Sequence, residues 1–143
     1  MQPITGNKLK GDFVVGFMLS PDLKQVVLIL KDHPDELKGW LNGLGGAVEP
    51  GESNVRAMVR KFQDEAGILT AESDWIHFGG KTTSEMRLAY YFCISEKYEA
   101  VRTAAGEHVC AIARAELDEY PLLPEIHDVL AHLDMRLLTS YAT

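Results

Sequence analysis

Two adjacent acidic residues, Asp64 and Glu65, have side chains whose types and spacing could do chemistry. Lys61 precedes them by three and four residues, so the three side chains are neighbours if the segment is a helix. Carboxylate oxygens held this closely suit hard divalent ions such as Mg²⁺ or Mn²⁺. An ordinary acidic helix face is the commoner meaning of two adjacent acids, and these residues alone leave both interpretations open.

A helix must position these side chains, and the sequence marks both of its ends. Ser53 is a candidate N-cap, because its hydroxyl can accept a backbone N–H of the first turn. Gly67 suits the C-terminal cap, since glycine adopts a left-handed backbone without a Cβ clash. Apolar residues recur at helical spacing and predict a buried stripe of Val55, Met58, Val59, Phe62 and Ala66. The polar residues fall on the other side: Arg60, Lys61, Asp64 and Glu65.

The segment from Gly46 to Ile68 resembles the Nudix box, G-x5-E-x7-R-E-U-x-E-E-x-G-U, in which U is a bulky aliphatic or aromatic residue. Asp64 replaces one glutamate conservatively, whereas Lys61 replaces another and reverses its charge. The preceding segment, 40–46, resembles the corresponding stretch of family members that act on nucleotides. The remaining box positions match in type and register: Gly46, Glu52, Arg60, Phe62, Glu65, Gly67 and Ile68.

The resemblance implies an enzyme, a Nudix-type pyrophosphohydrolase that acts on a small nucleoside diphosphate-linked substrate. A nucleoside triphosphate or an ADP-ribose type compound would fit this class. In the family, water attacks a phosphorus atom while Mg²⁺ or Mn²⁺ neutralises charge on the diphosphate. By resemblance, Asp64 and Glu65 would bind the metal, with the backbone carbonyl of Gly46 as a further ligand. Glu52 and Arg60 would pair with each other and brace the loop on the helix.

Lys61 departs from the family pattern, which has a carboxylate here as a metal ligand. An ammonium cannot ligate a cation and is expected to pair with Asp64 and Glu65, which would weaken metal binding. Three outcomes stay open. Lys61 could stand in for one cation against phosphate, Glu107 or Glu85 could supply the missing ligand or base, or the protein could be a catalytically weak or inactive nucleotide-binding or regulatory protein. The candidate catalytic residues are therefore Glu65, Asp64, Arg60, Glu52 and Glu107.

The residues in front of the helix are candidates for contact with the nucleotide. Asn42 lies where related nucleotide-sanitising members touch the base, and its amide offers both a donor and acceptors. Asn42 and Gly43 are equally well explained as a turn pair, and both interpretations stay open. Trp40 is expected in the core. The candidates for nucleotide binding are Asn42, Gly45, Gly46 and Lys61.

Length and charge limit the partners. The chain has 143 residues and a net charge of −7, which argues against a nucleic-acid backbone or an anionic membrane as the main partner. An anionic nucleotide is compatible, because bound divalent cations change the local sign of the charge. No apolar run approaches membrane-spanning length, and Cys93 and Cys110 lack metal-like spacing, so we expect a cytoplasmic protein with reduced cysteines. A homodimer stays open.

The order of the predicted elements indicates the fold class. Strands are expected over 13–19, 25–31, 44–48, 75–80, 87–95 and 107–113, and the first two should form an antiparallel hairpin. A final helix should begin near Pro124 and run to about Leu138. Together these elements indicate one domain over residues 1–143, of the α+β class. The resemblance implies a Nudix-like α/β/α sandwich with a mixed central β-sheet.

Overall fold

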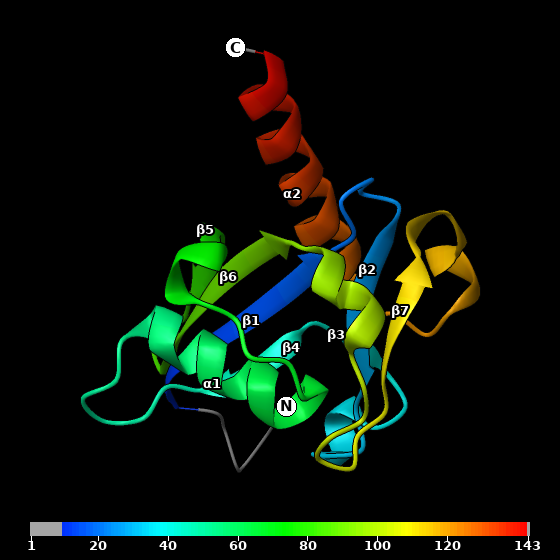
Figure 1. The fold of residues 1–143 in the computed structure, drawn as a ribbon. Coiled ribbons are helices and arrows are strands. Elements are labelled where there is room, and N and C mark those ends of the chain that lie inside the picture. Colours follow the sequence, from blue (N-terminus) through cyan, green and yellow to red (C-terminus); the bar gives the residue numbers. More distant parts are fainter. Residues whose placement is uncertain (1–9, 143) are drawn as a thin grey trace.

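The computed structural model describes residues 10–142, with side chains as far as Thr139 (Figure 1). Two long helices occur in this part of the chain, α1 (Asn54–Ala66) and α2 (Pro124–Ala142). Short 3-10 helices lie at Asp35–Leu37, Glu72–Asp74, Glu96–Ala100 and Arg114–Glu119. The strands are β1 (Gly11–Leu19), β2 (Gln25–Leu30), β3 (Leu41–Asn42), β4 (Leu44–Ala47), β5 (Ile76–Thr82), β6 (Met86–Ile94) and β7 (Val109–Ala113).

β1 is the central strand of a mixed sheet. It pairs in parallel with β6 along its whole length. Its other edge is divided, because β4 pairs antiparallel with the segment 13–16 and β2 pairs antiparallel at Leu19. The sheet order is β3-β2-β1-β6-β5, with β7 beside β2. The predicted hairpin and mixed sheet are confirmed, and β4 lies where the sheet divides, one loop before α1.

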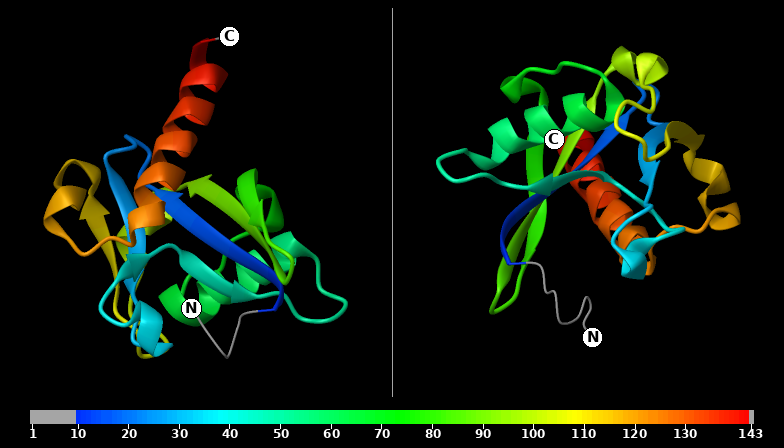
Figure 2. Two further views of the ribbon diagram at one scale, coloured as in Figure 1. Left: turned by 180° about the vertical axis from the view of Figure 1, so that it is seen from behind. Right: turned by 90° about the horizontal axis from the view of Figure 1, so that it is seen from below.

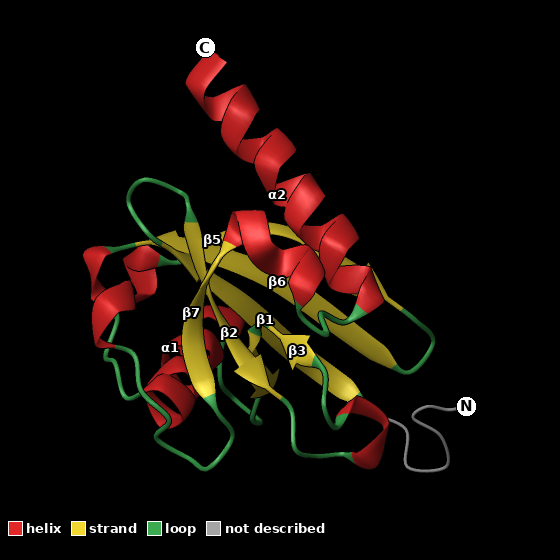
Figure 3. Cartoon of the chain, turned by 90° about the vertical axis from the view of Figure 1, so that its right-hand side faces the viewer, coloured by secondary structure: helices red, strands yellow, loops and turns green. Residues whose placement is uncertain are grey.

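The two helices cover opposite faces of this sheet (Figures 2 and 3). Successive side chains of a strand point to opposite faces, so β1 contributes to two apolar cores. Phe17 and Leu19 pack in the core beneath α2, whereas Val14 and Met18 pack in the core beneath α1. The α/β/α sandwich of the α+β class is therefore confirmed. The helices contribute Ile126, Leu130, Leu133 and Leu137 from α2, and Ala57, Met58, Phe62 and Ala66 from α1.

Both predicted ends of α1 are confirmed. The Ser53 hydroxyl accepts the backbone N–H of Arg56 at 3.2 Å, which satisfies a donor that the first turn leaves open. Gly67 has φ = 73° and donates its N–H to the carbonyl of Gln63 at 2.9 Å. These caps determine where α1 begins and ends, and hence which residues lie in its last turn.

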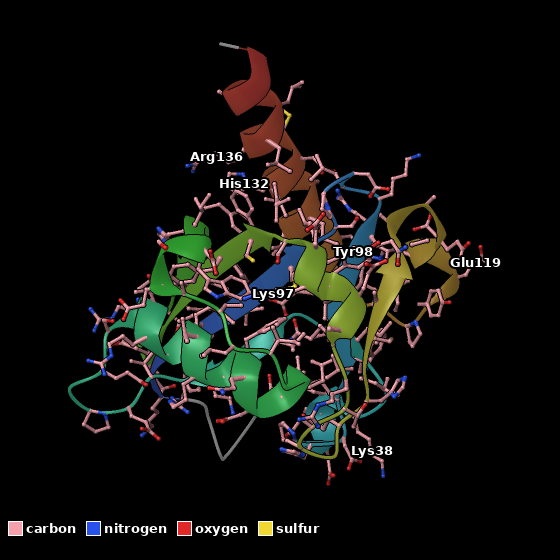
Figure 4. The ribbon with its side chains drawn as sticks, in the orientation of Figure 1. Lys38, Lys97, Tyr98, Glu119, His132 and Arg136 are labelled. Atoms are coloured by element: carbon pink, nitrogen blue, oxygen red, sulfur yellow. The ribbon has the colours of Figure 1, made fainter. Side chains whose placement is uncertain are left out.

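The second half of the chain differs from the prediction in detail. β5 extends past the predicted end at residue 80 to Thr82, because it continues to pair with β6 as far as Arg87. α2 begins at Pro124 as predicted but runs on to Ala142. His132 of α2 lies against β5, with Nε2 3.0 Å from the Phe78 carbonyl oxygen (Figure 4).

No helix within residues 10–142 has the length and apolarity needed to cross a membrane.

Candidate functional site

Glu65, in the last turn of α1, is buried against β4. Its side chain is 7% exposed, and its Oε1 accepts the backbone N–H of Gly45 at 3.0 Å. Burial raises the pKa of this carboxyl group, against the opposing effect of the Lys61 and Lys31 ammonium groups. Helical spacing placed Glu65 on the polar face of α1. The prediction of an exposed side chain is wrong, because β4 covers this side of the last turn.

Asp64 lies beside Glu65 but is more exposed. Its side chain is 55% exposed, and its Oδ2 is 3.9 Å from Nη1 of Arg60. Asp64 and Glu65 both line one open cavity of about 470 Å³. The structure therefore brings these two predicted metal ligands to a common cavity. Two further candidates from the sequence, Lys61 and Glu107, line the same cavity. The full lining is Ile29, His33, Lys61, Asp64, Glu65, Ala105 and Glu107.

Glu107 reaches this cavity from the segment before β7, and its oxygens are already engaged. Oε1 accepts Nζ of Lys31 at 3.1 Å, and Oε2 accepts the backbone N–H groups of Asp32 at 2.6 Å and His33 at 3.3 Å. Burial alone would raise the pKa of Glu107, but these hydrogen bonds and the Lys31 charge outweigh it, and the pKa is lowered. Glu107 is thus an ionised carboxylate that holds the segment 31–33.

Glu85, the other candidate for a missing ligand or base, lies elsewhere. It occupies the turn between β5 and β6 and lines a separate cavity with Asp12, Thr83 and Arg87. Its backbone carbonyl accepts the N–H of Gly11 at 3.0 Å. The structure does not bring Glu85 to Asp64 and Glu65.

Lys61 extends from α1 across the backbone of Gly46. A Cβ atom added to Gly46 would lie 2.7 Å from Cε of Lys61, so the missing side chain of Gly46 leaves room for the lysine stem. Lys61 makes no ion pair within 4.0 Å among the described residues. The expected pairing with Asp64 and Glu65 is therefore wrong in this structure. Since β4 holds Gly46 beneath the lysine stem, the ammonium lies along the wall of the cavity.

The predicted pair of Glu52 and Arg60 forms. Arg60 donates Nε to Oε2 of Glu52 at 2.8 Å and Nη2 to Oε1 at 2.9 Å, in a bidentate contact. Nη2 also donates to the carbonyl of Ala47 at 3.0 Å, and Oε1 accepts the N–H of Glu49 at 3.0 Å. The hydrogen bond from Arg60 is the main cause that lowers the pKa of Glu52 to about 2. Neither residue lines the cavity that contains Glu65.

A second cavity, of about 290 Å³, lies between the sheet and the start of α2. Most of its walls are apolar. Asn42 lines it, and the Oδ1 of Asn42 accepts the N–H of Gly43 at 2.7 Å. The turn interpretation of this pair is therefore confirmed, and Asn42 also lines a cavity. The apolar lining includes Val15, Leu37, Leu88, Leu123 and Ile126, and the polar lining includes Lys31, Asn42, Lys81, Tyr90 and Glu125.

The linings of the two cavities share no residue, but two hydrogen bonds connect them, one from the backbone of β4 and one from Lys31. Gly45 and Gly46 line the second cavity, while Gly45 binds Glu65 of the first. Lys31 lines the second cavity, and its Nζ binds Glu107 of the first. Sequence reasoning missed Lys31, because nothing local to it distinguishes it from a solvated lysine at a strand end.

Trp40, expected in the core, is 38% exposed.

The donors available here fit one divalent ion. Within residues 10–142, no three His, Cys, Asp or Glu residues are grouped as a complete metal site. Asp64 and Glu65 supply two carboxylates, whereas Gly46, the third predicted ligand, lines the other cavity. Mg²⁺ commonly takes one or two carboxylates and completes its shell with water and substrate phosphate. The residues therefore fit a cation that is shared with a phosphate-bearing substrate.

The chain belongs to the Nudix family, because it matches the NUDIX domain over residues 11–135. Proteins of this family are generally hydrolases, and the enzymes generally use divalent metals. The comparison with curated proteins gave no significant match.

Solved structures with the same fold include several Nudix proteins. One is a MutT, from a study of Aliivibrio salmonicida and Vibrio cholerae, with 24% identity and a TM-score of 0.70; the match covers 85% of this chain and 94% of that one. The NUDIX domain of Shewanella oneidensis NrtR, complexed with ADP ribose, has 17% identity and a TM-score of 0.73, over 91% and 90% of the two chains. MutT from Bacillus halodurans has 22% identity and a TM-score of 0.67, over 87% and 82%.

Proposed function

We propose that this protein hydrolyses a small nucleoside diphosphate-linked compound with the help of Mg²⁺ or Mn²⁺. The observation that carries the proposal is a pair of unlike cavities whose linings are connected by the hydrogen bond between Gly45 and Glu65. One is mostly apolar and suits a nucleoside, while the other holds carboxylates beside an ammonium group. A diphosphate joined to a nucleoside has the same division into an apolar and an anionic half.

Residues of this chain could bind the metal ion and the phosphates of the anionic half of the substrate. Asp64 and Glu65, with the backbone carbonyl of Gly46, would hold the divalent ion. When bound, the ion would neutralise phosphate charge and assist the attacking water. Gly45 orients Glu65 through its N–H, so one carboxylate oxygen of Glu65 remains for a cation. Lys61 offers an ammonium group to the phosphates from the same cavity.

The apolar half would take the base and the sugar. Apolar walls favour a base, and the amide of Asn42 can hydrogen-bond to its edge. Lys31 stands between the two cavities, where the sugar and first phosphate of such a compound would lie. A nucleoside triphosphate and an ADP-ribose type compound both fit this description.

Three residues support the site, and their charged groups are already engaged in hydrogen bonds: Glu52, Arg60 and Glu107. The bidentate contact between Glu52 and Arg60 ties the loop after β4 to α1. Glu107 holds the segment that carries Lys31, which lines the apolar cavity. We assign these three residues positioning roles, and the reacting groups to Asp64 and Glu65.

A second candidate function is nucleotide binding with little or no hydrolysis. It is favoured by a specific observation: Lys61 occupies a box position that otherwise carries a carboxylate, and the oxygens of Glu107 are committed to Lys31, Asp32 and His33. No free third carboxylate therefore faces the cavity among the described residues. Such a protein would bind the same compounds.

The test is a turnover screen of nucleoside triphosphates, ADP-ribose and dinucleoside polyphosphates with Mg²⁺ or Mn²⁺, reading released phosphate or pyrophosphate. Glu65→Gln serves as the matched control, because it keeps the size of the side chain and removes its charge. The proposed hydrolase predicts turnover that needs the metal and disappears in Glu65→Gln. Tight binding of one of these compounds by calorimetry, without turnover, would instead establish the second candidate.

A further inference from the structure

Lys61 lines the cavity that also contains Asp64 and Glu65, here called the acidic cavity. Lys31 binds Glu107 at 3.1 Å, and Arg60 binds Glu52 at 2.8 Å. His33 also lines the cavity, and its Nδ1 is 3.4 Å from Glu107. Lys61 alone among these groups has no ion-pair partner within 4.0 Å in residues 10–142.

The change in charge from a carboxylate to the ammonium group of Lys61 equals the charge of one divalent ion. Asp64, Glu65 and Lys61 together carry −1 − 1 + 1 = −1, and one divalent ion would bring this set to +1. A glutamate at position 61 would make the set −3, and two divalent ions would then be needed to reach the same +1. Replacing a carboxylate by an ammonium changes the local charge by two units, as does one Mg²⁺ or Mn²⁺.

We propose that Lys61 is a diphosphate-binding residue whose ammonium group takes the place of one divalent ion, so that the site operates with a single metal. This inference rests on the proposed function and specifies how its anionic half is recognised. The position of the stem supports it. Gly46 leaves space for the stem across β4, and the ammonium lies beside this strand, which lines the apolar cavity. A lysine is a compact point charge on a flexible chain and binds phosphate without further partners.

The first experiment measures binding without any metal. The probe is α,β-methylene-ADP in EDTA, titrated by calorimetry into the wild type and three variants. Lys61→Met should weaken binding about tenfold or more, whereas Lys61→Arg should stay within about threefold, because it keeps the positive charge. Lys24→Met is the matched control, since Lys24 is an exposed lysine in the turn between β1 and β2 and lines neither cavity. It should bind as the wild type does.

The second experiment counts ions. Mn²⁺ is titrated into the complexes with α,β-methylene-ADP and followed by electron paramagnetic resonance. The wild type should bind one Mn²⁺ for each protein and Lys61→Glu should bind two. Thermal melting of every variant shows that it is folded.

The outcomes separate this inference from the proposed function. Two or more Mn²⁺ ions in the wild type, or unchanged metal-free binding in Lys61→Met, would overturn the role of Lys61 and leave the proposed function standing. Failure of the folded wild type to bind any nucleoside diphosphate compound, with or without Mn²⁺, would overturn both.

Discussion

The backbone N–H of Gly45 donates a hydrogen bond to the buried carboxylate of Glu65 at 3.0 Å. This contact joins β4 to the last turn of α1 across 20 residues of sequence. It fixes the position of Glu65 in the lining of the acidic cavity and engages only one of its two carboxylate oxygens. The same strand forms a wall of the apolar cavity, so one short segment sets the distance between the two halves of the site.

Glu65→Gln should abolish Mn²⁺ binding while the metal-free protein melts at an unchanged or higher temperature. The amide oxygen of glutamine can still accept the Gly45 N–H, and the variant no longer buries a charge. Thermal melting in EDTA and an Mn²⁺ titration check the two effects. Full Mn²⁺-dependent turnover in this variant would remove Glu65 from the site, and Asp64→Asn, at a more exposed position, should weaken Mn²⁺ binding less severely.

The stability difference between the wild type and Glu52→Gln should depend on pH. The pKa of Glu52 is lowered from 4.5 to about 2, chiefly by the hydrogen bond from Arg60. A lowered folded-state pKa contributes stability in full above the unfolded value, and this is lost as pH falls through the folded value. The difference should therefore stay constant from pH 7 to about 5 and shrink between about 4.5 and 2. Urea unfolding across this range measures it, and a difference that is the same at every pH would contradict the role of the ionised pair.

Gly45→Ala should destabilise the fold far more than Gly46→Ala. A Cβ at position 45 would lie 1.9 Å from the carbonyl oxygen of Val14, in the neighbouring strand, so backbone must move. A Cβ at position 46 meets only the flexible end of Lys61. We expect Gly45→Ala to cost about 3 kcal/mol or more and Gly46→Ala less than about 1 kcal/mol. Urea unfolding of the two variants gives the comparison, and equal losses would place the close contact elsewhere.

Asn42→Ala should weaken the binding of nucleotides about tenfold and leave the binding of inorganic pyrophosphate unchanged. Asn42 lines the apolar cavity, where a base would lie, and pyrophosphate has no group to place there. The variant also removes the acceptor of the Gly43 N–H, which costs about 1 kcal/mol of stability. Calorimetry with ADP and with pyrophosphate separates the effects. Equal weakening of both ligands would show that Asn42 acts only through the loop.

Glu107→Gln should loosen the segment 31–33 and destabilise the fold by about 2 kcal/mol. Lys31 would lose its carboxylate partner in a half-buried position, and the backbone amides of Asp32 and His33 would lose an ionised acceptor. Hydrogen exchange of these two amides should accelerate, while the amides in the centre of α1 keep their protection. Unchanged exchange at Asp32 would show that Glu107 is not what holds this segment.

Sequence alone determined the family, the fold class and the helix that carries the acidic pair. The ends of α1 are decided within one turn, by the Ser53 hydroxyl at one end and the left-handed Gly67 at the other. The contact of Glu52 with Arg60 spans a loop and two helical turns, a separation that the box spacing already specifies. Interactions of this range depend on local backbone geometry, which is why pattern and spacing predict them.

Only the tertiary structure decided which charges are neutralised and which remain available. Glu107 meets Lys31 across 76 residues, because β7 pairs with β2 and brings the segments beyond their ends together. Glu65 is buried because β4, held by β1, covers the last turn of α1, and Lys61 lies along the cavity because that strand presents a glycine to its stem. The apolar cavity likewise exists only where the start of α2 packs near β1 and β6. These properties arise from packing between distant segments, and a linear pattern carries no information about which carboxylate a given ammonium will reach.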